Sequence, residues 1–494
     1  MGSSEAEILE RSTGVWKRRL MRVGAALAAI ALIAIAYLWF SRERIAGDFI
    51  DDYLAKSGIA ASYDIVQIGA KQQVIENVVV GDPAAPDLTV DRVVVDISYG
   101  LGTAQIGAAR LERPRLYATY RDGALSLGAL DTVLFSEGDE PAALPALDLT
   151  IVDGGALLES DFGDVGVAFE GAGQIDDGFS GTLAAVAPGL SFAPCQAERL
   201  TAYGAIATED GAPRFDGPVR LSGGACDEAK LASADVSASL SLTADFARFE
   251  GNLDLAAREL SFGQNGAERA EGRATFTVGE GAMIVDHDIR VAALSSPYVG
   301  VQDLRAEGAL RSARGYSQSS WNARFEGQGV DLVADANQSL AQAQDAVADT
   351  LLAPLLAKLE RGLTSARRTT ELRGDAIWRL DDKAQSLVIP QATVRNASGE
   401  TILAVSRLAW SAGESAQTQR LSGNFLTGGR DLPQINGRMD QGADGRLALR
   451  LTMDEYAAGE DRIAVPSLLV REERGGEYSL SGSVRASGAL PGGA

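Results

Sequence analysis

The chain has 494 residues, of which 46% are hydrophobic but only 6% aromatic, with 55 glycines and a formal net charge of −22. This acidic balance excludes general nucleic-acid binding, because phosphates need lysine and arginine partners. Many glycines and few aromatic residues favour short strands joined by tight turns. We therefore expect a mainly β protein with an elongated or repetitive architecture.

Residues 23–40 read VGAALAAIALIAIAYLWF and carry no charge. As a helix rising about 1.5 Å per residue, this stretch is just long enough to cross a bilayer core. Basic residues cluster before it, so the positive-inside rule predicts a cytoplasmic tail at 1–22, an anchor at 23–40 and export of the remainder. A cleaved signal peptide is the competing interpretation, although the apolar run continues past Ala34-Ile35-Ala36. The expected anchor includes Val23, Leu27, Ile30, Ile33, Trp39 and Phe40.

Four further segments follow the anchor. Apolar residues at helical spacing predict an amphipathic helix over 41–58, which ends at Gly58. Strand patterns with turn signals run through 59–336. Residues 337–368 are rich in Ala, Leu, Gln and Arg and predict a helical insertion, which Pro354 kinks or divides and which either covers one end of the sheet or plugs it. Strands resume over 369–494, and we expect them to continue beyond this chain or to be covered by another.

Strict alternation of apolar and polar residues marks many of the expected strands, and VSASLSLTADF (Val236–Phe246) is the longest example. Such strands have one apolar face, which another surface must cover. Two sheets could cover each other as sandwiches, one sheet could close into a barrel, or a long curled sheet could form an open groove for apolar guests. On the basis of this alternation, the residues predicted to line such a groove are Val93, Val95, Ile97, Leu240, Leu242, Phe246, Leu447, Leu449 and Leu451.

The sequence offers little catalytic chemistry. Cys195 and Cys226 could form one disulfide after export or remain two small buried residues. His287 is the single histidine, and we interpret it as a surface or strand-edge residue because histidine metal sites normally need several imidazoles. Neither a nucleophile elbow nor a phosphate-binding loop is visible, so we expect no enzyme, no cofactor and no metal.

The segment DYLAKSGIAASYDIVQIGAKQQVIENVVVGDPAAPDLTVDRVVVDI (52–97) resembles the N-terminal region of the bacterial AsmA-like clan. Within that clan it is most similar to the YdbH-type intermembrane phospholipid transport proteins. Residues 116–131 (LYATYRDGALSLGALD) and 149–167 (LTIVDGGALLESDFGDVGV) also resemble this group.

This resemblance implies an elongated, curled antiparallel β-groove of the AsmA/TamB-like kind, with an N-terminal transmembrane helix and one internal helical segment. It further implies a single-pass protein of the bacterial inner membrane, whose periplasmic groove carries phospholipids between the inner and outer membranes without covalent chemistry. The partners expected are phospholipids, the inner membrane, and outer-membrane or periplasmic proteins. The alternative is an envelope assembly or scaffold protein that engages an outer-membrane β-barrel through its strand edges.

Overall fold

The described part of the chain comprises almost only strands. The computed structural model describes residues 59–69, 72–99, 104–122, 124–131, 144–192, 194–279, 281–297, 299–313, 315, 317–332, 341–342, 344–345, 353–365, 370–381, 384–413, 420–430, 432–442, 445–473 and 477–488. Within these ranges, no helix is long and apolar enough to cross a membrane. The expected anchor at 23–40 and the expected amphipathic helix at 41–58 lie outside them.

The described elements are 27 strands, one α-helix and one short 3-10 helix, and the strands are linked in one sheet. The first strands are β1 (Ala61–Ile68), β2 (Gln72–Asp82), β3 (Ala85–Tyr99), β4 (Ala104–Glu112), β5 (Arg115–Arg121), β6 (Ala124–Ser126), β7 (Asp148–Ser160), β8 (Val165–Gln174), β9 (Ser180–Ala187), β10 (Leu190–Phe192), β11 (Cys195–Ala197), β12 (Arg199–Glu209), β13 (Ala212–Cys226) and β14 (Ala229–Leu242). They continue with β15 (Arg248–Phe262), β16 (Asn265–Gly279), β17 (Ala282–Ser295), β18 (Val299–Ala313), β19 (Gln318–Leu332), β20 (Glu371–Asp381), β21 (Ala384–Arg395), β22 (Thr401–Ala412), β23 (Arg420–Thr427), β24 (Ile435–Gln441), β25 (Leu447–Ala458), β26 (Asp461–Glu472) and β27 (Tyr478–Ser487). The helices are η1 (Gly128–Leu130) and α4 (Ala353–Ser365). The expectation of a mainly β, antiparallel fold is confirmed for these residues.

The chain divides into two compact units. The first holds residues up to Glu140, together with Ala146–Glu159 and Ala168–Gln174. The second holds Pro141–Pro145, Ser160–Val167 and everything from Ile175 onward.

The first unit has the less regular topology. Strands β1, β2 and β3 form an antiparallel meander, and β3 then pairs with both β4 and β5. Strand β7 returns beside β4 in parallel, with Ala108 opposite Asp148 and Glu112 opposite Val152. A parallel pair cannot be closed by a tight hairpin, so the chain between β4 and β7 must cross over.

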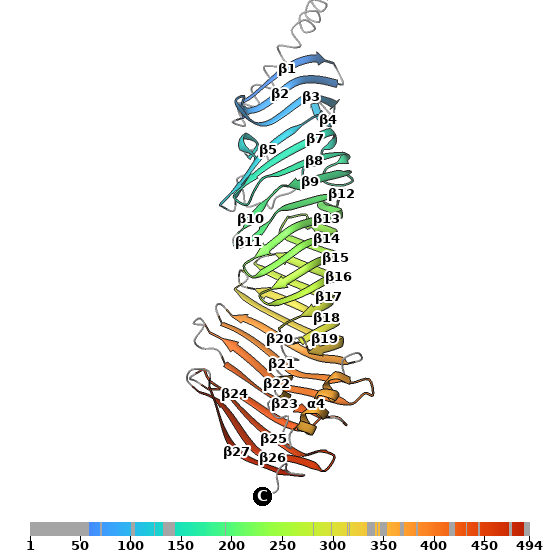
Figure 1. The fold of residues 1–494 in the computed structure, drawn as a ribbon. Helices are drawn as coiled ribbons and strands as arrows, with labels where there is room; N and C mark the ends of the chain where they lie inside the picture. Colours follow the sequence, from blue (N-terminus) through green and yellow to red (C-terminus); the bar gives the residue numbers. More distant parts are fainter. Residues whose placement is uncertain are drawn as a thin grey trace, which may run out of the picture. The chain divides into compact units, whose positions relative to one another are not determined.

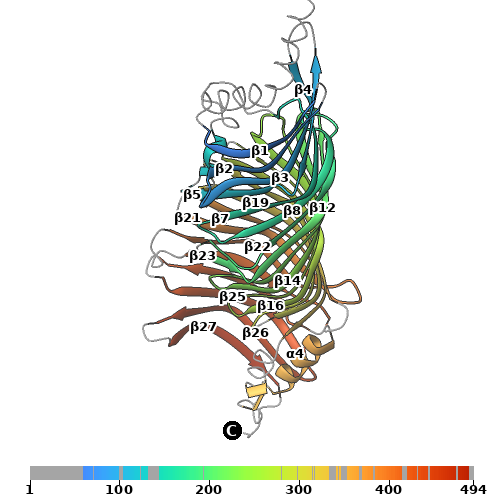
Figure 2. The ribbon, with the colours of Figure 1, turned by 90° about the horizontal axis from the view of Figure 1, so that it is seen from above.

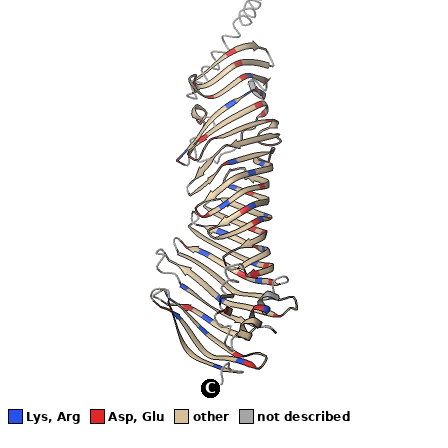
Figure 3. Cartoon of the chain, viewed as in Figure 1, with Lys and Arg blue, Asp and Glu red and all other residues tan. Residues whose placement is uncertain are grey.

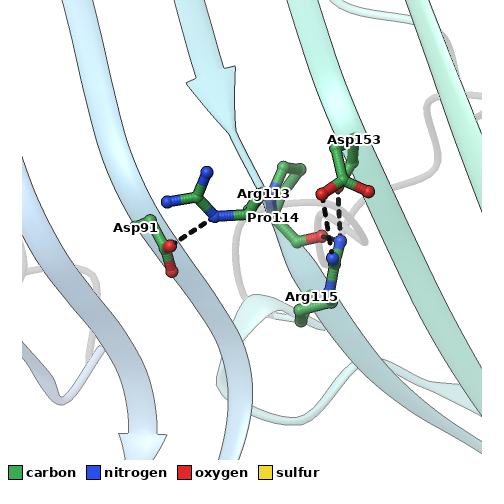
Figure 4. A network of polar contacts seen from close by, with 5 residues as sticks. All are labelled: Asp91, Arg113, Pro114, Arg115 and Asp153. Atoms are coloured by element: carbon green, nitrogen blue, oxygen red, sulfur yellow. Dashed lines mark hydrogen bonds and ion pairs between the residues drawn. The ribbon is translucent and has the colours of Figure 1, made fainter.

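A polar network holds this crossing in place (Figure 4). Arg113 Nε donates to Asp91 Oδ2 at 2.6 Å, and this hydrogen bond raises the pKa of the Arg113 guanidinium above its usual value. Arg115 donates to the backbone oxygen of Asp153 and lies 3.4 Å from its carboxylate, while the Gly155 N–H donates to the Pro114 oxygen at 2.8 Å. The turn between β4 and β5 is thereby tied to β3 on one side and to β7 on the other.

The second unit is a long meander. From β12 to β27 each strand pairs antiparallel with the next one in sequence (Figure 1). Strand β12 also pairs with β9, and the strands of this unit are visibly curved in Figure 2. Because β19 and β20 pair from Gln318–Asp381 to Gln328–Glu371, the sheet continues across the segment 337–368.

The expectation that Phe246 continues the strand is wrong. Strand β14 ends at Leu242, and Phe246 lies in the following turn with φ of +56°. Polar side chains make this turn: the Arg248 N–H donates to Thr243 Oγ1, and the Ala247 N–H donates to Asp245 Oδ1, both at 3.1 Å. The Thr243 hydroxyl also donates to the Asp245 carboxylate, which lowers the pKa of that exposed group. Such side chains compete with the sheet for backbone hydrogen bonds, so alternation stops here.

The described part of the helical segment packs on a strand hairpin. The described residues of helix α4 run from Ala353 to Ser365 and include Pro354. Leu355 is only 4% exposed. Lys358 Nζ donates to the Ala457 oxygen at 3.0 Å and lies 4.8 Å from the centre of the Tyr456 ring. These contacts place α4 against the end of the β25–β26 hairpin.

Candidate functional site: the apolar face of the sheet

One face of the second unit carries an unbroken apolar row from β9 to β27, which we call the long row. Each member lies directly opposite the next one on the neighbouring strand, so the register of the whole sheet is what aligns them. The members are Ala185, Ala202, Val219, Val236, Leu255, Gly272, Ile289, Ala306, Phe325, Gly374, Ala392, Val405, Phe425, Gly437, Leu451, Leu468 and Gly482. We call the face that bears this row the apolar face.

Parallel rows widen the apolar face on both sides of the long row. The row on one side consists of residues two positions from the long-row member of the same strand. Its members are Leu200, Leu221, Ala234, Ala257, Ala270, Val291, Leu304, Gly327, Leu372, Val394 and Leu403. On the other side lie Gly217, Ala238, Leu253, Ala274, His287, Gly308, Ala323 and Ala376. In these three rows His287 is the single polar side chain.

The large side chains of this face are only half-buried. Val236, Leu255, Ile289 and Phe325 all keep part of their surface accessible, whereas the buried positions are small residues such as Ala238. A sandwich would cover the large side chains with a second sheet. Within the described residues of this unit they are not so covered, so the groove interpretation fits this face and the sandwich does not.

The opposite face is charged and exposed. Next to the members of the long row, alternately one residue before and one residue after them in sequence, the strands carry a cross-strand row of Asp254, Arg273, Asp288, Glu307, Arg324 and Asp375. Arg273 pairs with Asp254 at 2.8 Å, and Arg305 donates two hydrogen bonds to Asp288 at 2.7 and 2.6 Å. The Arg305 contact lowers the pKa of the Asp288 carboxyl. Exposed pairs of this kind contribute little stability individually. They keep this face in water, and Figure 3 marks the charged positions along the strands.

Aromatic rings lie over glycines within the long row. A Cβ added at Gly437 would collide with the Phe425 ring, and one added at Gly374 would collide with the Phe325 ring. Each ring is therefore folded down onto the neighbouring strand instead of standing away from the sheet. The rings thereby cover the glycine backbone with apolar surface, and they project less far from the sheet at these points.

The apolar face continues across a point where the alternation of apolar and polar residues in the sequence is interrupted. In β15 the apolar spacing changes from two to three between Ala257 and Leu260, and Glu259 in this gap has φ of +52°. Its position is skipped in the ladder with β16. Ala293 and Gly329 take positive φ at matching positions of β17 and β19. At these positions the backbone turns so that the next side chain returns to the same face, while the pairing register between the strands is unchanged.

A cavity of about 510 Å³ opens at this margin of the apolar face. It is lined chiefly by Leu200, Leu221, Leu231 and Leu260, together with the disulfide-bonded Cys195 and Cys226. The two cysteines are directly opposite each other on β11 and β13. The disulfide therefore fastens the short strand β11 beside the cavity.

Most of the residues nominated by alternation belong to this face. Leu240 lies opposite Phe215 and Gly251, two positions from Ala238, and Leu242 lies opposite Phe249. Leu451 is in the long row. Leu449 and Leu447 precede it on β25, with Leu449 opposite Met439 and Val470.

Strand β3 of the first unit does not have one clean apolar side. Val93 and Val95 are half-buried, but so is Val94, whose partner Val74 is only 3% exposed. The side chain of Ile97 lies outside the described residues. Sequence alternation therefore does not separate the two faces of this strand.

His287 corrects the sequence-based interpretation. It is neither at a sheet edge nor on the charged face, because β17 lies between β16 and β18 and His287 is opposite Ala274 and Gly308. Its Nε2 accepts a hydrogen bond of 2.7 Å from Trp321 Nε1, and its Nδ1 is buried without a partner among the described residues. Within the described ranges, no group of three or more His, Cys, Asp or Glu is placed to hold a metal ion.

Comparison with known proteins agrees with this geometry. The family model for YdbH-like proteins, described as intermembrane phospholipid transport protein YdbH, matches residues 29–493. A search of curated proteins finds no match.

Proposed function

Because the chain belongs to the YdbH-like family of intermembrane phospholipid transport proteins, we propose that it moves phospholipids between the inner and outer membranes along the apolar face of its sheet. The long row supports this most directly, since it offers a continuous, half-exposed apolar path across the strands from β9 to β27. Each acyl methylene removed from water there gains about 0.8 kcal/mol. No covalent step is required, and the direction of transport follows from lipid imbalance or from partners.

The proposed location is the periplasm, with residues 23–40 as an inner-membrane anchor. Two observations support it: the uncharged stretch preceded by basic residues, and the disulfide between Cys195 and Cys226. Disulfides persist in oxidising compartments such as the periplasm and are rare in the cytosol.

Lipid loading of matched variants tests the function. The full chain is purified in mild detergent and its bound phospholipids are counted by native mass spectrometry after gentle detergent removal. Wild type is expected to carry several phospholipids. Replacing Leu240 and Leu242 by asparagine should reduce the load, whereas asparagine at Ser239 and Ser241, on the other face of the same strand, should not. A lipid-free wild type, or equal losses in both variants, would refute the proposal.

Site-specific cross-linking provides a second readout if the leucine variant misfolds. A photoreactive phenylalanine analogue at Leu451, in the long row, should cross-link phospholipid. The same analogue at the neighbouring Arg450, whose side chain is exposed, should not.

The alternative, a scaffold that engages a β-barrel partner, is favoured by one observation on β27. All ten of its residues are exposed, including Tyr478, Leu480 and Val484 at 62%, 68% and 54%. An exposed strand can be extended by a strand of another protein. A partner captured by cross-linkers on β27, with no lipid bound to the purified chain, would favour this function over transport.

A further inference from the structure

The three described tryptophans lie in one cross-strand row of the apolar face. Trp321 on β19 is directly opposite Trp378 on β20, which is opposite Leu387 on β21, which is opposite Trp410 on β22. The sequence contains five tryptophans, and the other two, Trp16 and Trp39, precede the described residues. We call Trp321, Trp378 and Trp410 the tryptophan row.

The three indoles differ in their hydrogen bonding. Trp321 Nε1 is already engaged, because it donates to His287 at 2.7 Å. The Nε1–H groups of Trp378 and Trp410 have no acceptor among the described residues, and both side chains are half-buried. Within the part of the chain that the structure describes, two neutral donors are therefore left without an acceptor on the apolar face.

The tryptophan row marks a boundary on this face. On one side, beyond Ala323 and Ala376, lie the long row and its apolar neighbours. On the other side the next cross-strand row consists of Ser312, Ser319, Leu380, Gln385 and Ala412. Ser312 and Ser319 share a hydrogen bond of 2.8 Å between their hydroxyl groups. This row therefore mixes polar and apolar side chains, whereas the long row and its two neighbouring rows have His287 as their single polar side chain.

A phospholipid presents the same sequence of chemistry: acyl chains, then two ester groups, then a charged head group. Indoles favour the region between apolar and polar surroundings, because the ring is apolar and the N–H needs an acceptor. A phosphate would call for lysine or arginine. The long row and its two neighbouring rows contain neither, so the acceptor that fits two neutral donors is a neutral carbonyl.

We propose that Trp378 and Trp410 hold the ester carbonyl oxygens of a phospholipid whose acyl chains lie along the long row. This inference rests on the proposed transport function and adds the orientation of the lipid across the groove. The Trp321 N–H already donates to His287, so this indole contributes apolar surface to the row without offering a donor.

Competition between ester-linked and ether-linked phospholipids tests the proposal, because the ether lipid has the same head group and chain length but no carbonyl. Full-length wild type should bind the ester lipid about twofold to tenfold better for one hydrogen bond, and up to about a hundredfold better if both indoles donate. Replacing Trp378 and Trp410 by phenylalanine should abolish this preference without changing the total lipid load. The control Phe325→Leu, in the long row, should keep it. A wild type without preference, or a preference that survives in the double variant, would overturn the proposal.

Fluorescence quenching provides an independent readout. In full-length W16F/W39F protein the tryptophan row is the only source of indole emission. Lipids brominated next to the carboxyl end of the acyl chain should quench this emission more than lipids brominated near the methyl end. Equal or reversed quenching would overturn the orientation while leaving transport standing. Absence of bound lipid in either experiment would instead refute transport itself.

Discussion

The indole N–H of Trp321 donates to Nε2 of His287 at 2.7 Å, from β19 across β18 to β17. An imidazole that accepts at Nε2 carries its proton on Nδ1 when neutral. That Nδ1 is buried and has no partner among the described residues. The Trp321–His287 pair therefore gives Nε2 a hydrogen bond but leaves the buried Nδ1 without one among the described residues.

Replacing His287 by leucine should leave stability unchanged or raise it by about 1 kcal/mol. The variant loses the Trp321 hydrogen bond, but the half-buried indole can still reach water, and the unpaired buried Nδ1 is removed. Chemical denaturation followed by circular dichroism measures the difference. Trp321→Phe is the matched control and should be destabilising, because it leaves both imidazole nitrogens without a partner. A clear loss of stability in His287→Leu would contradict this account.

Asp288→Asn should remove a pH-dependent contribution to stability. Arg305 lowers the pKa of Asp288, so the folded state favours the carboxylate. This stabilisation is fully present above the ordinary aspartate value of about 3.9 and disappears as pH falls through the lower value of the folded state. The urea midpoints of wild type and variant should therefore differ at about pH 7 and converge in acid. If the difference between the two urea midpoints grew as the pH fell, the proposed stabilisation of the Asp288 carboxylate by Arg305 would be contradicted.

Gly437→Ala should cost about 1–2 kcal/mol, because the new methyl group displaces the Phe425 ring from its place over the glycine. Gly189→Ala is the control, since a Cβ at Gly189 meets nothing within 4 Å. Thermal unfolding should distinguish the two. If both variants behaved like wild type, the ring would not depend on the glycine.

Removing the disulfide by Cys195→Ser and Cys226→Ser should destabilise the region around β11 by about 2–4 kcal/mol, since the bond closes a loop with a sequence separation of 31. Hydrogen exchange should show faster opening of β10, β11 and the end of β13. Reduction of the wild-type protein should reproduce this pattern. Unchanged exchange in both cases would mean that packing alone holds β11.

Alternation along the sequence predicted the faces of single strands but not the rows across them. The register between strands, which decides that Val236 meets Leu255 and then Gly272, depends on long-range pairing. Phe246 was assigned to the wrong element because apolar spacing outweighed the turn-forming Thr243 and Asp245. The spacing of three between Ala257 and Leu260 was the available signal for the positive-φ residue Glu259.

Contacts between distant residues of the apolar face could likewise not be predicted from the sequence. A lone histidine in a sequence suggests a solvated residue, and nothing near position 287 points to its indole partner 34 positions later. The three described tryptophans are separated by 57 and 32 residues, as 321, 378 and 410 show, so only the sheet brings them together. The family, in contrast, was predicted correctly from short segments, and the match over residues 29–493 confirms it.

The strand order of the second unit allows a protein of this kind to gain or lose whole hairpins. From β12 to β27 each strand pairs with its immediate neighbours in sequence, so one hairpin depends directly only on the two that flank it. In assemblies of this kind stability is close to a sum of local units and nearest-neighbour terms. Whole hairpins can then be duplicated or deleted during evolution without re-registering the rest. The length of the apolar face can therefore change in steps of one strand pair.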